Sequence, residues 1–156
     1  MKRRVYLETT VPSYLTSRPS RDLVIAGHQQ ITREWWEMRR HAFRLYVSQL
    51  VVDEVSAGDP VAARERLKVI QPIPLDITPD VAALASNILD SGTIPRKAAT
   101  DAAHIAIAAV HGMDFLVTWN CVHIANAAIA KALVALCRDH ACECPVICTP
   151  EELLGE

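Results

Sequence analysis

The chain has few aromatic residues, little net charge and no long hydrophobic run. Aromatic residues make up 5% of its 156 residues, whereas hydrophobic residues make up 51%. This much apolar material excludes a disordered chain, and its aliphatic character favours helices packed on a buried parallel sheet over an aromatic-rich β-sandwich. Because the formal net charge is −2, binding of nucleic acid must rest on local basic patches.

Membrane and export signals are also missing. No run of about eighteen apolar residues is present, which excludes a membrane-spanning helix. In the basic segment MKRRVYLETT, an acidic residue follows after only three apolar residues, and this apolar stretch is too short for a signal peptide. We therefore expect a cytoplasmic protein without membrane contact. Four of the five cysteines lack paired CxxC spacing, and we expect reduced thiols rather than a zinc site. These four are Cys137, Cys142, Cys144 and Cys148.

Short apolar runs alternate with longer helical patterns along the chain. We expect strands at residues 5–7, 43–47, 73–76, 115–118 and 145–148, and helices at 13–18, 20–40, 49–57, 79–90, 100–111 and 122–137, with another from Pro60. Helix starts are predicted at Ser20, Asp59 and Thr78, and Thr149 is expected to cap a final turn. This βαβ series predicts an α/β fold, a three-layer α/β/α sandwich with a central, mainly parallel five-stranded sheet, in a single domain over residues 1–156.

Four polar residues are expected at the carboxyl ends of the strands, where ligands bind in such sheets. Glu8 follows the first strand, Glu54 lies in the helix after the second, Asp101 begins the helix at 100–111, and Asn120 follows the fourth strand. Three converging carboxylates would repel one another unless they bind a cation. Hard oxygen ligands of this kind suit Mg²⁺ or Mn²⁺.

Each of these residues also has an ordinary structural interpretation. Glu8 can end a strand, Glu54 can lie on a solvated face, and Asn120 can form a turn. Taken singly, these interpretations are favoured. Asp101 is the exception, because its helix, DAAHIAIAAVHG, is so apolar that it must be buried, which places the acid at the mouth of a crevice.

Three motifs occur in the order YLETTVPS, SQLVVDEV and ATDAAHIAIAAVHGMDFLVTWN. Together they resemble the PIN-domain family, from Val5 to the TPEEL near the C-terminal end. Within that family the sequence is most similar to the VapC-type toxins of prokaryotic toxin–antitoxin modules. The resemblance implies an endoribonuclease that hydrolyses RNA phosphodiester bonds with one or two Mg²⁺ or Mn²⁺ ions. It also implies RNA and a small antitoxin protein as partners.

The family's site positions match this sequence one by one. Its three acids match Glu8, Glu54 and Asp101, which the resemblance makes metal ligands, and its fourth position matches Asn120. The family usually has Asp at the first and fourth positions, so this site carries a formal −3 instead of −4, and a second metal should bind more weakly. Water is the expected nucleophile. The expected supporting residues are Thr9, Thr10, Thr118 and Asn126.

Contacts to RNA are expected from Arg96 and Lys97, because the chain leads from this pair directly to Asp101. Trp119 either stacks on a base or forms a wall of the site. His104 follows Asp101 by three residues. It either approaches the metal or, as is commoner, is a hydrogen-bonded helix residue.

Two further points stay open. The chain can instead be a PIN-like RNA- or partner-binding module whose catalysis is weakened by the departures at Glu8 and Asn120. A cofactor-binding α/β domain is disfavoured, since YLETTVPS contains no glycine after the first strand.

Trp35 and Trp36 also have two interpretations. Either they supply a surface for a homodimer or an antitoxin, or one ring packs in the core while the other is half covered.

Overall fold

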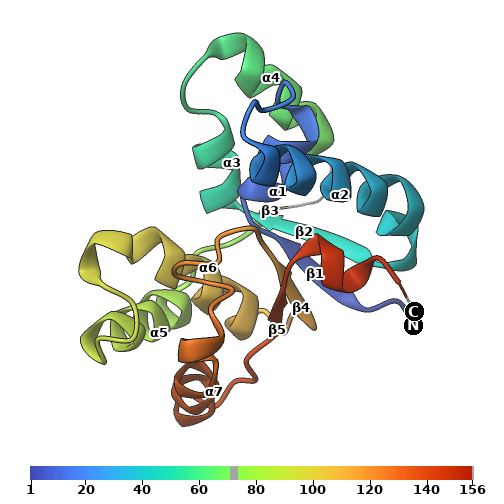
Figure 1. Cartoon of the computed structure of the whole chain (residues 1–156). Coiled ribbons are helices and arrows are strands. Elements are labelled where there is room, and N and C mark those ends of the chain that lie inside the picture. The colour runs from blue at the N-terminus through green and yellow to red at the C-terminus, as the bar shows by residue number, and fades with distance from the viewer. Residues whose placement is uncertain (71–73, 156) are drawn as a thin grey trace.

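A parallel sheet forms the centre of the protein. The computed structural model, drawn in Figure 1, describes residues 1–70 and 74–155. Its strands are ordered β3-β2-β1-β4-β5, and every neighbouring pair is parallel. The predicted parallel sheet is therefore confirmed, while residue 73 of the predicted third strand lies outside the described residues. The strands are β1 (Arg4–Leu7), β2 (Arg44–Ser48), β3 (Pro74–Leu75), β4 (Phe115–Val117) and β5 (Val146–Cys148).

Helices cover both faces of the sheet. They are α1 (Thr10–Thr16), α2 (Leu23–Arg39), α3 (Gln49–Val55), α4 (Pro60–Val69), α5 (Pro79–Asp90), α6 (Ala99–Val110) and α7 (Ala130–Asp139). Short 3₁₀ turns are η1 (Arg40–Ala42), η2 (Arg96–Ala98), η3 (Ala127–Ile129) and η4 (Pro150–Leu153). Figure 1 shows α1, α2 and α4 on one side of the sheet and α5, α6 and α7 on the other, which is the predicted three-layer arrangement. Among the described residues, no helix combines the length and apolar character needed to cross a membrane.

Side-chain caps place most helix starts where the sequence predicts them. Asp59 and Thr78 accept backbone amides at the starts of α4 and α5, and the Thr149 amide donates to a carboxylate within η4. The predicted start at Ser20 is wrong. Asp22 caps α2 instead, because its carboxylate accepts two first-turn amides at 2.9 and 3.1 Å.

The predicted helix at 122–137 is wrong in its first half, because α7 begins only at Ala130. Asn126 donates its side-chain amide to the Val122 carbonyl at 2.9 Å and accepts the Ala128 amide at 2.9 Å. Asparagine side chains that bond nearby backbone groups in this way compete with helical hydrogen bonds. Apolar periodicity alone therefore overestimated the length of this helix.

The core lies around β1 and α6. Val5 and Tyr6 of β1 are fully buried, since β1 has a strand on each side and helices over both faces. Most of α6 is buried too, as its apolar sequence predicts. Trp35 is fully buried and stacks on Phe43 with ring centroids 6.1 Å apart, whereas Trp36 is half-buried. The alternative with one tryptophan in the core is therefore the one observed.

The three central strands end beside one another and lead directly into polar residues. β2 ends at Ser48, which caps α3, while Glu8 follows β1 and Thr118 follows β4. Because these strands are parallel neighbours, their carboxyl ends lie at one edge of the sheet. This edge brings together residues more than a hundred positions apart in the sequence and carries the candidate site.

Candidate functional site

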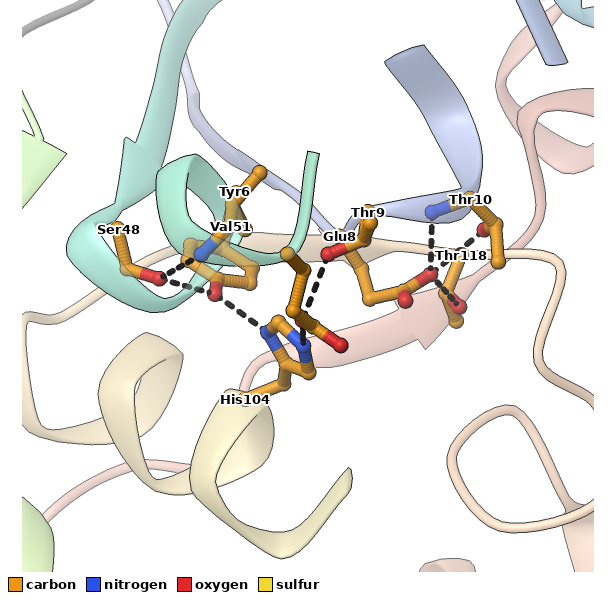
Figure 2. Close-up of polar contacts among 9 residues, drawn as sticks. Tyr6, Glu8, Thr9, Thr10, Ser48, Val51, His104 and Thr118 are labelled. Atoms are coloured by element: carbon orange, nitrogen blue, oxygen red, sulfur yellow. Dashed lines mark hydrogen bonds and ion pairs between the residues drawn. The ribbon is translucent and has the colours of Figure 1, made fainter. Parts of the chain in front are cut away.

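Glu8 is the most firmly held acid at the carboxyl edge of the sheet. Its Oε1 accepts the Thr10 hydroxyl at 2.6 Å, the Thr10 amide at 3.1 Å and the Thr118 hydroxyl at 2.7 Å (Figure 2). Only 5% of the residue is exposed. Three donors on one oxygen fix the carboxylate, and Oε2 is left without a hydrogen bond from the described residues.

Glu54 reaches the same edge from α3. Its Oε1 accepts the Thr9 hydroxyl at 2.8 Å and lies 2.6 Å from Nε2 of His104 on α6. Partial burial would raise the pKa of the Glu54 carboxyl, but the hydrogen bond from His104, the charge of that ring when it is protonated and the hydrogen bond from Thr9 together lower that pKa below its ordinary value. Glu54 is therefore ionised at neutral pH, as a cation ligand must be.

A buried chain of polar side chains, Ser48, Tyr6 and His104 (Figure 2), leads to Glu54. Nδ1 of His104 is 2.7 Å from the Tyr6 hydroxyl, and that hydroxyl is 2.8 Å from the Ser48 hydroxyl. His104 is 1% exposed, and the other two residues are fully buried. Both ring nitrogens of His104 are thus engaged by the protein, which favours the hydrogen-bonded helix residue over the metal ligand.

Asp101 connects to Glu8 through a second series of hydrogen bonds. Asp101 Oδ2 lies 3.1 Å from Nδ1 of His123, whose amide donates to Oδ1 of Asn120 at 3.0 Å. The Asn120 amide then donates at 2.9 Å to the Thr118 hydroxyl, which itself donates to Glu8. We call the three acids and these connecting residues the acid site. Hydrogen bonds connect Glu8, Asn120 and Asp101 in this series, whereas Glu54 is held separately by Thr9 and His104.

The acid site produces a negative electrostatic field. Burial raises the pKa of Tyr6 far above its ordinary value, and the charges of Glu8 and Glu54 raise it further. Burial also raises the pKa of Tyr14, to which Glu8 again contributes. Two tyrosines on different elements are thus affected by the same carboxylate. Such a field attracts cations to this edge of the sheet.

The donor chemistry of the acid site fits a hard divalent cation. Oε2 of Glu8, Oε2 of Glu54 and Oδ1 of Asp101 accept no hydrogen bond from residues 1–70 and 74–155, while the other oxygen of each carboxylate is engaged. Carboxylate oxygens are the donors that Mg²⁺ and Mn²⁺ prefer. In the described part of the chain, no three acidic, histidine or cysteine side chains are close enough to hold one ion.

The remaining predicted residues differ in their surroundings. Arg96 forms an ion pair with Asp90 at the end of α5, whereas Lys97 is exposed and forms no hydrogen bond or ion pair with the described residues. Asn126 caps η3 and bonds only backbone groups of its own turn. It also lines a groove of about 540 Å³ between α7 and β5, to which none of the three acids contributes. Lys97 is thus the freer of the two predicted RNA contacts.

Trp119 lies next to Thr10, the hydrogen-bond partner of Glu8. It is 8% exposed, and the His28 ring stacks on it with centroids 4.0 Å apart and planes 11° apart. Its indole N–H donates to the Thr32 hydroxyl at 2.7 Å, and its backbone amide donates to the Thr10 hydroxyl at 2.9 Å. One ring face is already covered, which leaves little of the ring for stacking on a base.

Sequence reasoning missed the two residues that lie behind His104. Neither Tyr6 nor Ser48 was singled out, although a tyrosine in a buried strand needs a partner for its hydroxyl. Ser48 also carries a recognisable signal, since a serine before an apolar helix is a typical N-cap and here accepts the Val51 amide. What the sequence does not contain is the pairing of these residues across β1, β2 and α6.

Comparison of the chain with protein-family models found no match, and comparisons with curated proteins and with solved structures found none either. Support for a function therefore comes from two sources. One is the chemistry of the acid site, and the other is the resemblance carried by the three sequence motifs.

Proposed function

We propose that this protein is a Mg²⁺- or Mn²⁺-dependent endoribonuclease that hydrolyses RNA phosphodiester bonds and acts as the toxin of a type II toxin–antitoxin module. The observation that carries the proposal is the convergence of Glu8, Glu54 and Asp101 from three separate elements. Each of these acids keeps one carboxylate oxygen free of hydrogen bonds from the described residues.

Glu8, Glu54 and Asp101 would hold the cation, which when bound supplies a Lewis acid that activates water and stabilises the departing oxygen. The neighbouring hydroxyls orient these acids instead of attacking the phosphate. Thr118 is fully buried and donates to Glu8, and Thr9 donates to Glu54. Water is therefore the attacking nucleophile in this proposal.

Lys97 is the side chain best placed to bind an RNA phosphate near the acids. It lies in η2, the 3₁₀ turn that directly precedes α6 and Asp101, and it is exposed without a hydrogen bond or ion pair to the described residues. Arg96 must first give up its ion pair with Asp90. Its contribution to RNA binding should therefore be the smaller of the two.

A PIN-like RNA- or partner-binding module is the second candidate function. It is favoured by one observation, which is that the side-chain oxygen of Asn120 already accepts the His123 amide at 3.0 Å. Asn120 thus acts as a turn residue, and it carries no charge to attract a second cation. Catalysis weakened at this position would leave binding as the main activity.

Purified protein assayed on RNA with Mn²⁺ or Mg²⁺, and with EDTA as control, tests the proposal. We expect cleavage that needs the metal and is lost in the Glu8→Gln variant. Glu34→Gln is the matched control, because Glu34 is an exposed acid on α2. Equal cleavage in EDTA, or in Glu8→Gln, would contradict the proposal. RNA binding without cleavage would favour the binding module.

The proposed partners are a small antitoxin protein and a second copy of the chain, and the proposed location is the cytoplasm. With Trp35 in the core, the exposed apolar side chains of α2 are Leu23, Val24, Ile25 and Met38. These four side chains remain available for an interface with another protein. Light scattering of the purified protein, alone and mixed with the product of any adjacent small reading frame, tests both partners.

A further inference from the structure

Three buried polar residues, Ser48, Tyr6 and His104, form a continuous chain that ends on Glu54. The distances are 2.8 Å from Ser48 Oγ to Tyr6 Oη, 2.7 Å from Tyr6 Oη to His104 Nδ1, and 2.6 Å from His104 Nε2 to Glu54 Oε1. Figure 2 shows the first three side chains in line. Because they are 0 to 1% exposed, each hydrogen must find its partner inside the protein.

The positions of these hydrogens follow from the far end of the chain. Ser48 Oγ accepts the Val51 amide at 3.2 Å, and Tyr6 Oη is the only acceptor among the described residues for the Ser48 proton, which therefore donates to Tyr6. In the same part of the chain, the Tyr6 proton then has Nδ1 of His104 as its only remaining acceptor. Nδ1 is therefore an acceptor, and the proton of a neutral imidazole lies on Nε2, where it donates to Glu54.

We propose that Ser48 and Tyr6 hold His104 in its Nε2–H tautomer, and that His104 thereby positions the Glu54 carboxylate toward a cation. His104 is in this view a positioning residue and not a ligand. The part that concerns the cation rests on the proposed function. The assignment of the tautomer does not depend on the proposed function.

Positioning matters here because Glu54 has a flexible side chain that is about one-third exposed. Two donors on Oε1, from Thr9 and His104, fix the rotation of the carboxylate and leave Oε2 free. With the opposite tautomer, the Nε2 lone pair of His104 would face the carboxylate and repel it. Groups that orient metal ligands in this manner typically change metal affinity by about 10- to 100-fold when removed.

Nuclear magnetic resonance of the ring nitrogens of His104 tests the tautomer in metal-free protein. We expect Nδ1 to resonate as an unprotonated nitrogen and Nε2 as a protonated one. In Tyr6→Phe, where Nδ1 loses its donor, we expect a mixture of tautomers. A protonated Nδ1 in the parent protein would overturn the proposal, whether or not any variant folds.

Titration with Mn²⁺ by calorimetry tests the positioning, with two variants that separate the two ring nitrogens. His104→Gln places an amide donor near the Nε2 position, whereas His104→Asn supplies a polar group only near Nδ1. We expect His104→Gln to bind Mn²⁺ within about threefold of the parent and His104→Asn about tenfold more weakly or worse. Thermal unfolding of each variant confirms that it is folded.

Two results would contradict this expectation. If His104→Gln and His104→Asn weaken Mn²⁺ binding equally, His104 acts only by filling space. If neither changes it, His104 has no role in positioning Glu54. If the parent itself binds no Mn²⁺, the proposed function fails and the cation part of this inference fails with it, while the ring-nitrogen measurement still decides the tautomer.

Discussion

The two ends of the acid site are built differently. Glu8 is 5% exposed and receives three hydrogen bonds on one oxygen from Thr10 and Thr118. The Asp101 side chain is 18% exposed, and its one partner among the described residues is His123 at 3.1 Å. Glu8 follows a central strand, whereas the partner of Asp101 lies in the turn before α7.

This difference separates stability from function. Removing the Glu8 carboxylate leaves the buried Thr118 hydroxyl and the half-buried Thr10 hydroxyl without this acceptor, so that end of the site should contribute to folding as well as to the proposed metal binding. Removing the charge of Asp101 disturbs one hydrogen bond at a less buried position. Substitutions there should change the chemistry and leave the fold as it is. Five predictions test this contrast, beginning with the largest effect.

Asp101→Asn should lower metal-dependent RNA cleavage by at least about a hundredfold, because a neutral amide replaces a charged cation ligand. Asparagine still accepts the hydrogen bond from His123, and repulsion among the acids is relieved. The metal-free variant should therefore melt no lower than the parent. Cleavage assays and thermal unfolding measure the two effects. Cleavage at the parent's rate would show that Asp101 is not part of the site.

Glu8→Ala should lower the free energy of unfolding by about 2–3 kcal/mol, because the hydroxyls of Thr10 and Thr118 lose a charged acceptor. Glu8→Gln keeps an acceptor oxygen and should be less destabilised, which makes it the matched control. Urea denaturation at neutral pH without metal provides the comparison. If Glu8→Ala is as stable as the parent, both ends of the acid site tolerate the loss of a carboxylate equally well, which would contradict the contrast drawn here.

Asn120→Asp should tighten Mn²⁺ or Mg²⁺ binding by about 1–2 kcal/mol, roughly tenfold, because it adds a charge at the less buried end. Asp keeps an oxygen that can accept the His123 amide, so the turn should survive. Calorimetric titration of both proteins measures the change, alongside cleavage. Unchanged affinity would place Asn120 outside the metal site, and tighter binding without cleavage would favour the binding module.

Lys97→Ala should weaken RNA binding by about twofold to fivefold at low salt and reduce its salt dependence, as expected for one lost phosphate contact. Arg96→Ala should have a smaller effect, because Arg96 is paired with Asp90. Binding titrations at several salt concentrations, with an inactive Asp101→Asn background, compare the two. A larger effect of Arg96→Ala than of Lys97→Ala would show that Arg96, and not Lys97, is the main RNA contact of the pair.

The smallest expected effect concerns pH and Glu54. A carboxyl whose pKa is lower in the folded than in the unfolded protein stabilises the fold above the unfolded pKa, and this contribution is lost as pH falls through the folded value. Because the pKa of Glu54 is lowered from an ordinary 4.5, the loss should occur below pH 4.5. Stability measured against pH should fall more steeply for the parent than for Glu54→Gln. Identical slopes would show that His104 and Thr9 do not stabilise the ionised form.

Much of the fold follows from local sequence signals. The alternation of apolar runs and helical patterns predicts the parallel sheet and its helical layers, and Asp59 and Thr78 mark the starts of α4 and α5. Prediction failed where side chains redirect the backbone. Asp22 displaces the start of α2 from Ser20, and Asn126 delays α7 to Ala130.

For the acid site, the sequence by itself determined which residues could take part. Acids and asparagine that follow strands or open helices must meet at the carboxyl edge once the strands are parallel. Only the tertiary structure decided how each acid is held. His104 lies three residues from Asp101 in the sequence yet bonds Glu54, 50 positions away, and Thr118 bonds Glu8 across 110 positions. The reason is physical: caps and periodicity depend on neighbours along the chain, whereas a hydrogen bond depends on tenths of an ångström set by the packing of separate elements.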